Sequence, residues 1–305
     1  MHLILLHRLD DTQVASVSVG IGKAQSTAIY QQPKGSSRMR SRPVDADKVI
    51  GGRLWSDVTL GLYSVAQDLA TMPMHRTGGL ISSIGLPAFS QVQDRLDDVR
   101  FYLLKATRIT SVLSFPIFIG LAVTAPEAVA VLLGAKWPAA APLLQILALI
   151  MPLRMVATLL PPALWSIGRP GISAGNVLIA ALVIPSACLI GAQWGPAGMA
   201  MAWLGAFPLV FGITLRRSGG VLGLGVPDFG RAMRAPALAS LAMAGVVIGT
   251  RYLLPEHAGA AARLLVLVPA GALTYLAALL GLERVAAVRP AGSRSGGTRR
   301  ARPAA

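Results

Sequence analysis

Residues 60–108 carry the pattern that decides the fold: LGLYSVAQDLATMPMHRTGGLISSIGLPAFSQVQDRLDDVRFYLLKATR. The part up to residue 91 is mainly apolar, and it is longer than the roughly 20 residues that a helix needs to cross the hydrocarbon core of a bilayer. Near its middle lie Asp68, His75 and Arg76. Their spacing places all three near one face of a helix. The stretch therefore predicts either a membrane helix with one polar face or an amphipathic helix of a soluble protein.

The composition separates these two alternatives. The chain has 305 residues, of which 54% are hydrophobic and 13% are charged, and its mean hydropathy is +0.61. Soluble proteins usually carry about 25% charged residues, so the composition indicates an integral membrane protein. The single cysteine, Cys188, lies inside an apolar run, so no internal disulfide is possible and the thiol is expected to serve as a small packing residue.

The net charge of the chain is +15. In a soluble chain such an excess would suggest binding to nucleic acid, because phosphate contacts need clustered Lys and Arg. Here the basic residues lie mainly in the N-terminal segment, between apolar spans and in the C-terminal tail. That distribution is typical of membrane proteins, whose cytoplasmic loops are rich in Lys and Arg. No nucleic-acid partner is therefore expected.

Apolar runs of membrane-spanning length recur along the chain. The run 170–215 contains no charged residue and is long enough for two crossings. We therefore expect an all-α fold, a polytopic transmembrane helical bundle with about seven spans. A mixed-charge connection over 91–108 separates the first two. The expected spans are 60–89, 109–133, 141–165, 173–192, 196–215, 235–253 and 262–282.

The chain divides into three parts. Residues 1–44 are basic and weakly patterned, which predicts a mostly disordered segment. The apolar run at residues 2–7 is too short for a signal peptide, whose core needs roughly 7 to 15 residues. Residues 45–285 form the predicted helical domain, and residues 286–305 form a basic cytoplasmic tail.

The basic residues also predict an orientation. They are concentrated in the first and fifth connections and in the tail, and Arg169 marks the third connection. Because basic loops stay in the cytoplasm, the first, third and fifth connections and the C-terminus are expected there. Seven spans then place the basic N-terminal segment outside, against the same rule. The simplest explanation is that the segment before Asp47 replaces a missing helix, so that the chain is a truncated copy of a longer protein.

Four stretches carry a resemblance to a known family. They are ADKVIGGRL from residue 46, LGLYSVAQDLATMP from residue 60, LPAFSQVQDRLDDVRFYLLKATRI from residue 86 and VLLGAKWPAAAPLLQILAL from residue 131, followed by Arg154. In this order and spacing the chain resembles the polysaccharide (O-antigen and exopolysaccharide) flippases of the multidrug/oligosaccharidyl-lipid/polysaccharide exporter superfamily. The resemblance covers only the C-terminal part of a fold that has two six-helix lobes, commonly followed by two further helices.

The resemblance implies a transporter that moves lipid-linked polysaccharide or lipopolysaccharide precursors across the inner membrane by alternating access. Its substrate would be a polyprenyl-pyrophosphate-linked oligosaccharide, and its partners would be membrane lipids and either a missing N-terminal lobe or a second copy. Cations in a central cavity are implied to receive the pyrophosphate, so the candidate substrate-cavity residues are Asp68, His75, Arg76 and Arg154. The alternatives are an internal ion pair among the first three, and an Arg154 that snorkels or caps free carbonyls.

Other functions stay open at this point. No enzyme constellation appears, because the four histidines form no HExxH pair, one cysteine cannot build a typical zinc site and no Walker motif is visible; no catalytic residue, metal or cofactor is expected. Glu127 could be a proton or cation site, although its place beside Pro126 favours an interfacial residue. The alternatives to a flippase are an inactive truncated fragment, a small-molecule exporter of the same superfamily, and a membrane polymerase or ligase, whose usual large outer loop is missing here.

Overall fold

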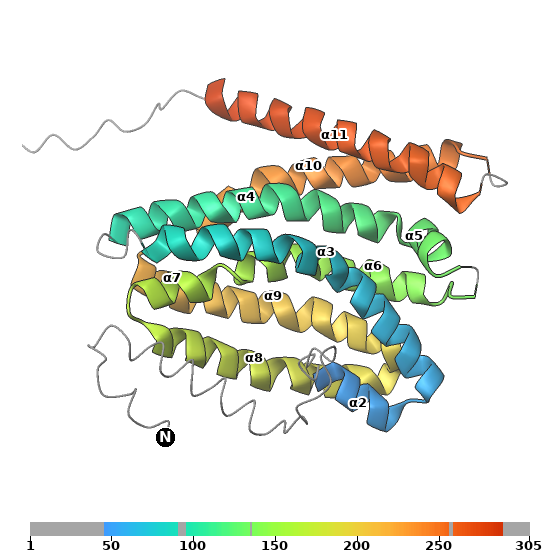
Figure 1. Cartoon of the computed structure of the whole chain (residues 1–305), viewed down its shortest axis with the longest axis horizontal. Helices are drawn as coiled ribbons and strands as arrows, with labels where there is room; N and C mark the ends of the chain where they lie inside the picture. Colours follow the sequence, from blue (N-terminus) through green and yellow to red (C-terminus); the bar gives the residue numbers. More distant parts are fainter. Residues whose placement is uncertain (1–45, 91–95, 135, 256–258, 289–305) are drawn as a thin grey trace, which may run out of the picture.

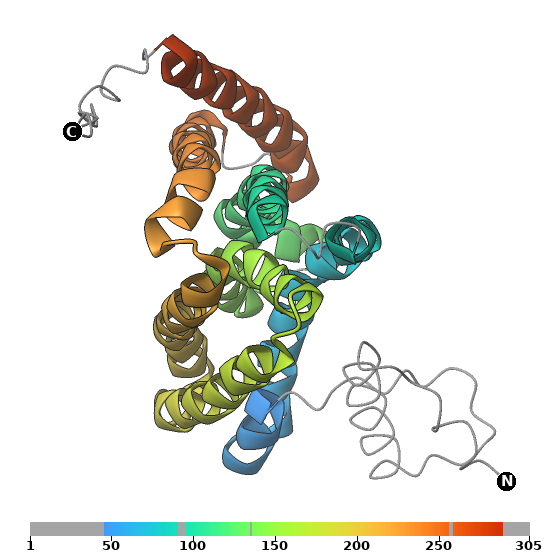
Figure 2. The same ribbon diagram turned by 90° about the vertical axis from the view of Figure 1, so that its left-hand side faces the viewer.

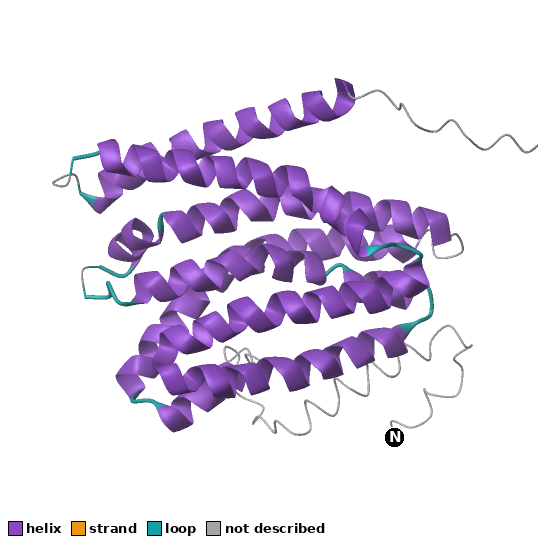
Figure 3. Cartoon of the chain, turned by 180° about the vertical axis from the view of Figure 1, so that it is seen from behind, coloured by secondary structure: helices purple, strands orange, loops and turns teal. Residues whose placement is uncertain are grey.

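The computed structural model describes residues 46–90, 96–134, 136–255 and 259–288; the side chains of residues 75–90 and 285–288 lie outside the described part. Helices make up this part of the chain, and it contains no strand (Figure 3). The predicted all-α fold is confirmed. The helices are α2 (Ala46–Leu54), α3 (Asp57–Ser90), α4 (Leu96–Val123), α5 (Ala125–Leu132), α6 (Ala140–Ala157), α7 (Leu160–Ser166), α8 (Pro170–Gly191), the 3₁₀ helix η3 (Ala192–Trp194), α9 (Gly195–Leu222), α10 (Val226–Leu253) and α11 (Ala260–Val288).

The predicted outer segments fall mostly outside this part of the chain. Residues 1–44 are not among the described residues, and α11 continues through Val288, three residues into the predicted tail 286–305. The division of the chain into these three parts stays a prediction.

The long helices lie side by side in a row (Figure 1). From top to bottom in that view the row runs α11, α10, α4, α6, α9 and α8, and α3 lies against α4 and α6. The short α2 packs against α3 and α8 at the lower edge of the row. Figure 2 shows the same row along its helix axes. Helix α6 occupies the centre, because it packs against α3, α4 and α9.

Three apolar clusters hold the row together. The first joins α3, α6, α8 and α9 around Tyr63 and Met151. The second joins α4, α6, α7, α9 and the start of α10 around Leu103. The third joins α4, α10 and α11 around Met243 and Tyr275. Helices α10 and α11 therefore form a separate layer that is attached to the rest mainly through α4.

The outward faces of the bundle are apolar. On α8, Val177 and Leu182 are each 63% exposed, and on α11, Leu265 and Leu273 are 77% and 69% exposed. Such a surface is unusual for a soluble protein but natural in lipid. Five stretches of the described residues are long and apolar enough to cross a membrane, and one of them, Pro170–Leu222, holds both α8 and α9. The chain is a multi-pass membrane protein; the number of seven spans, with α3 included, stays a prediction.

The predicted connection over 91–108 is wrong in extent. Helix α4 begins at Leu96 and runs without interruption to Val123. Asp97 and Asp98 occupy its first turn, where negative charges interact favourably with the helix dipole. Val99 and Leu103 are fully buried against the second cluster. This buried stripe extends the helix through a region whose charged composition suggested a loop.

The predicted span 141–165 consists of two helices. Pro161 and Pro162 have no N–H to offer to the carbonyls of Ala157 and Thr158 four residues earlier, so the helical hydrogen-bond pattern stops there. Helix α6 ends at Ala157, and α7 begins three residues later. The break lies one turn after Arg154.

Helices α8 and α9 turn back on each other through η3. Gly195 has a φ of +76°, a conformation that glycine adopts without strain. Gly191 and Gly198 lie so close together that a Cβ on either would overlap the carbonyl oxygen of the other. The indole N–H of Trp55 donates to the carbonyl of Ala192 at 3.1 Å. This bond ties the chain after α2 to the turn between α8 and α9.

The two ends of the bundle differ in charge. The C-terminal end of α3, the N-terminal end of α4 and the links from α7 to α8 and from α9 to α10 lie at one end, together with the C-terminal end of α11, at the left of Figure 1. These are the first, third and fifth connections. The structure therefore agrees with the predicted alternation, and the orientation across the membrane stays a prediction. The basic residues at this end of the described part are Arg100, Lys105, Arg108, Arg169, Arg216, Arg217, Arg231, Arg234 and Arg284.

Candidate functional site

A buried carboxylate joins α2, α3 and α9. Asp47 on α2 is 2% exposed. Its Oδ2 accepts hydrogen bonds from the hydroxyl of Tyr63 and the amide of Gln67, both at 2.8 Å, and from the indole N–H of Trp203 at 3.2 Å. Its Oδ1 accepts the backbone N–H of Lys48 at 3.0 Å. The negative charge of Asp47 is thus held by neutral donors from α3 and α9.

Sequence reasoning missed this cluster, which we call the Asp47 site (Asp47, Tyr63, Gln67 and Trp203). A weak signal was present, because Tyr63 and Gln67 lie four residues apart and therefore on one face of α3. Two hydrogen-bonding side chains on one face of an apolar helix call for a polar partner. No local pattern pointed to Trp203, which lies 156 residues after Asp47.

Arg154 lies on the other side of Trp203. It is near the middle of the 27-residue apolar stretch Ala140–Ser166, as the sequence predicted. The central guanidinium carbon lies 4.9 Å from the centroid of the Trp203 ring, within the range of a cation–π contact. The indole of Trp203 therefore has a carboxylate at its N–H edge and a guanidinium over its face.

The other three predicted site residues lie on α3. This helix is continuous from Asp57 to Ser90, so Asp68, His75 and Arg76 share one helix as expected. The Oδ1 of Asp68 lies 3.1 Å from the Nζ of Lys48 on α2, and the two side chains are 48% and 25% exposed. The side chains of His75 and Arg76 lie outside the described part. Their role in a cavity wall stays a prediction.

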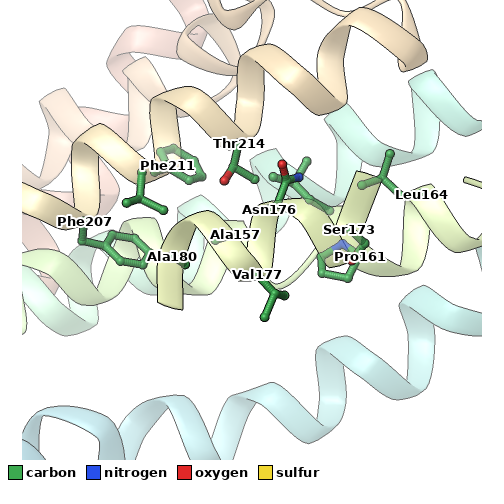
Figure 4. A pocket seen from close by; sticks show the side chains of 12 residues that line it. Ala157, Pro161, Leu164, Ser173, Asn176, Val177, Ala180, Phe207, Phe211 and Thr214 are labelled. Atoms are coloured by element: carbon green, nitrogen blue, oxygen red, sulfur yellow. The ribbon is translucent and has the colours of Figure 1, made fainter. Parts of the chain in front are cut away.

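A cavity of about 150 Å³ lies beside the break between α6 and α7, with α8 and α9 on its other sides (Figure 4). Ala157, one turn after Arg154, contributes to its wall, as do Phe207 and Phe211 on α9. Asn176 is 7% exposed and donates its amide to the hydroxyl of Ser218 at 3.1 Å. Ser173 and Thr214 add hydroxyl groups to this mainly apolar wall. The cavity lies next to Arg154 along the chain but is not lined by it.

A larger cavity of about 390 Å³ lies between α4, α10 and α11. Its wall is almost entirely apolar and includes Ile117, Val247, Leu267 and Ala272. Thr124 is the polar residue among those that line it. We call this cavity the apolar groove. A hydrocarbon chain is the type of molecule that such a wall accommodates.

Glu127 forms a second buried carboxylate, on α5. It is 4% exposed, and its Oε1 lies 3.0 Å from the Nη2 of Arg251 at the end of α10. Neither carboxylate oxygen accepts a hydrogen bond from the described residues. The ion pair fastens α5 to α10 at the end of the bundle opposite to the basic connections.

Part of the chain matches a known family, and the chain is similar to several known proteins. Residues 41–142 match the family model described as "Polysaccharide biosynthesis protein". The chain is 27% identical over 250 residues to the teichuronic acid biosynthesis protein TuaB of Bacillus subtilis (strain 168), which covers 79% of this chain and 50% of TuaB. It is 29% identical over 145 residues to the lipopolysaccharide biosynthesis protein WzxC of Escherichia coli (strain K12), which covers 47% of this chain and 30% of WzxC.

The fold resembles a solved structure, the lipid II flippase MurJ in an inward closed conformation. The TM-score is 0.63 at 16% sequence identity, with 80% of this chain and 52% of MurJ covered. The chain spans about half the length of TuaB and of MurJ. At this identity the likeness to MurJ shows the fold alone. The sequence matches confirm the resemblance expected from residue 45 onward: residues 41–142 match the polysaccharide biosynthesis family, and the chain is similar to TuaB and WzxC.

Proposed function

We propose that this chain acts as a flippase that moves lipid-linked polysaccharide or lipopolysaccharide precursors across the bacterial inner membrane by alternating access. The observation that carries the proposal is the position of Arg154, near the middle of the apolar stretch Ala140–Ser166 and over the ring of Trp203. A charged side chain at the centre of a span costs about 2.5–3.5 kcal/mol on insertion scales. Charged residues at such positions usually face a water-filled cavity and mark a substrate pathway.

The proposed substrate is a polyprenyl-pyrophosphate-linked oligosaccharide. A guanidinium binds phosphate oxygens in a bidentate manner, so Arg154 is suited to the pyrophosphate. The smaller cavity begins one turn after Arg154, at Ala157. Its wall offers amide and hydroxyl groups for sugar hydroxyls, from Ser173 and Asn176 on α8 and from Thr214 on α9. We propose Asp68, His75 and Arg76 on α3 as further residues of the cavity wall.

The apolar groove supports the lipid part of the proposal. A prenyl chain can lie between α4, α10 and α11 without leaving an apolar surface, because the wall of the groove is apolar. Ala272→Phe on α11 would fill the groove and is expected to weaken binding of a long prenyl pyrophosphate more than that of inorganic pyrophosphate. Leu273→Phe, on an exposed face of the same helix, is the matched control.

The proposal includes a partner and an orientation. Alternating access needs two bodies that rock about a site between them, and we propose an N-terminal lobe or a second copy as the second body.

The basic end of the bundle and the C-terminus are proposed to face the cytoplasm. A C-terminal fusion to alkaline phosphatase, an enzyme active only outside the cytoplasm, should then be inactive. An active fusion would contradict the orientation.

Complementation tests the transport function. The chain is expressed in a bacterial strain that lacks its own polysaccharide flippase, alone and together with the N-terminal half of TuaB, and surface polysaccharide is measured. We expect restoration in at least one of the two arrangements and its loss in Arg154→Ala, with partial function in Arg154→Lys. Arg234→Ala removes the same charge from an exposed position at the basic end and should have little effect.

Two results would contradict the proposal. Full complementation by Arg154→Ala, at the same membrane level as the parent chain, would remove Arg154 from the pathway. Absence of complementation in both arrangements, together with resistance to small toxic cations in the same cells, would favour a small-molecule exporter instead.

A further inference from the structure

Trp203 occupies a position between two charges. Its Nε1 lies 3.2 Å from the Oδ2 of Asp47, and its ring centroid lies 4.9 Å from the central guanidinium carbon of Arg154. The three residues come from α9, α2 and α6, which are far apart in the sequence. Trp203 is therefore the described side chain that touches both the buried carboxylate and the central cation.

The geometry suits a support for a phosphate-binding arginine. The Arg154 guanidinium carbon lies 4.9 Å from the centroid of the Trp203 ring, and a guanidinium that stacks its flat face on a ring keeps its N–H donors pointing outward in its plane. A phosphate group can therefore bind in that plane while the indole stays in contact. The hydrogen bond to Asp47 fixes the orientation of the ring, and a carboxylate that accepts the N–H makes the ring face more negative. Both effects strengthen the contact with Arg154.

We infer that Trp203, anchored by Asp47, is a positioning residue that holds the guanidinium of Arg154 in the orientation that receives the pyrophosphate of a prenyl-linked substrate. This inference rests on the proposed function and adds a residue to its site. Tyr63 and Gln67 bind the same carboxylate oxygen but do not contact Arg154 in the described hydrogen bonds and ring contacts. Substitutions at Tyr63 or Gln67 therefore remove a hydrogen bond of Asp47 but keep the Trp203 ring that contacts Arg154.

Binding of farnesyl pyrophosphate to the full chain in lipid nanodiscs measures the effect. Trp203→Leu removes both the ring and the N–H, and it is expected to weaken binding by about 2- to 30-fold, the range that corresponds to a cation–π contact. Trp203→Phe keeps a ring and should weaken binding less. Trp55→Phe is the matched control, because it removes an indole N–H bond, to Ala192, elsewhere in the same region. Unchanged binding in Trp203→Leu, or equal weakening in Trp55→Phe, would overturn the inference.

A double-mutant cycle distinguishes positioning from a general structural role. If Trp203 acts through Arg154, then Trp203→Leu should weaken binding in the parent chain but not further in an Arg154→Ala background. The same fold loss in both backgrounds would mean that Trp203 supports the fold rather than Arg154. Gln67→Leu leaves Trp203 bonded to Asp47 and should lower the affinity for farnesyl pyrophosphate less than Trp203→Leu does; an equal loss of affinity would also overturn the inference.

A measurement without any ligand separates this inference from the proposed function. The chain is labelled with 5-fluorotryptophan, and the ¹⁹F resonance of Trp203 is assigned by its absence in Trp203→Phe. We expect this resonance to shift in Arg154→Ala and in Asp47→Ala, and to stay in place in Arg234→Ala. If the Trp203 resonance keeps its chemical shift in both Arg154→Ala and Asp47→Ala, the inference is overturned even if the chain transports. A resonance that responds, in a chain that fails to bind farnesyl pyrophosphate, overturns the proposed substrate and with it the binding role of Trp203.

Discussion

Asp47 and Glu127 are both buried carboxylates, but the chain compensates their charges in different ways. Asp47 is 2% exposed and accepts hydrogen bonds from three neutral side chains on two helices. Glu127 is 4% exposed and faces one cation, the guanidinium of Arg251. Neither of its oxygens accepts a hydrogen bond from the described residues. The Asp47 carboxylate is therefore bound by several neutral donors, whereas the Glu127 carboxylate is paired with a single cation.

The difference indicates what each site can do. Neutral donors stabilise a carboxylate without cancelling its charge, so Asp47 keeps a negative charge close to Trp203 and, through that ring, to Arg154. An ion pair cancels its own charge and fixes two elements to each other. The Asp47 site is therefore suited to an electrostatic role beside Trp203, whereas Glu127 and Arg251 are suited to fastening α5 to α10.

The largest expected effect is that of Asp47→Ala. It leaves the Tyr63 hydroxyl, the Gln67 amide and the Trp203 indole without their acceptor, and we expect a loss of about 2–4 kcal/mol in the free energy of unfolding. Unfolding by sodium dodecyl sulfate in mixed micelles measures it. Asp47→Asn still offers one acceptor oxygen and should cost about 1 kcal/mol. Equal losses in the two variants would mean that charge, rather than acceptor capacity, holds the cluster together.

Arg251→Met should come next, with a loss of about 1–3 kcal/mol, because it leaves the buried Glu127 uncompensated. The partial exposure of Arg251, 31%, keeps the expected value below that of a fully buried pair. The double variant Arg251→Met/Glu127→Leu should recover most of the loss, since two apolar side chains replace the pair. A double variant that is less stable than Arg251→Met would show that Glu127 has a further role.

These two sites also show what the sequence could and could not predict. The apolar runs located the helices well, because length and composition dominate when the solvent is lipid. The boundaries failed where burial opposed composition, as at Val99 and Leu103 in α4, and where Pro161 and Pro162 divide a run that looks continuous. Hydropathy averages charge and apolar character over a window, so it cannot register a buried stripe within a charged segment.

The candidate site was less accessible to prediction than the fold. The cost of a lone central charge made Arg154 visible, and its position near the middle of an apolar stretch agrees with that expectation. Asp47 was hidden at the edge of a short polar segment, and Trp203 looked like any aromatic in an apolar run. Their importance depends on a contact between residues 156 positions apart, which the pattern along one chain does not contain.

Tyr63→Phe tests whether the three donors of Asp47 share its charge. Gln67 and Trp203 remain bonded to the same oxygen, so we expect a loss of about 1 kcal/mol, the usual net value of one hydrogen bond. The ring of Tyr63 stays in the first apolar cluster, which makes the substitution nearly isosteric. A loss as large as that of Asp47→Ala would mean that one donor carries the site and that the contrast with Glu127 is weaker than the geometry indicates.

Asp68→Asn should have the smallest effect on stability. Asp68 is 48% exposed and faces Lys48, and exposed ion pairs contribute about 0–1 kcal/mol. The expected loss is therefore below about 1 kcal/mol, and it should shrink further at high salt, because salt screens exposed charges. Lys48→Met is the matched control, since it removes the other member of the pair. If Asp68→Asn lowers complementation while Lys48→Met does not, Asp68 acts in transport as a wall residue. If both variants complement fully, the pair is structural and the electrostatics of the pathway depend on Asp47 and Arg154.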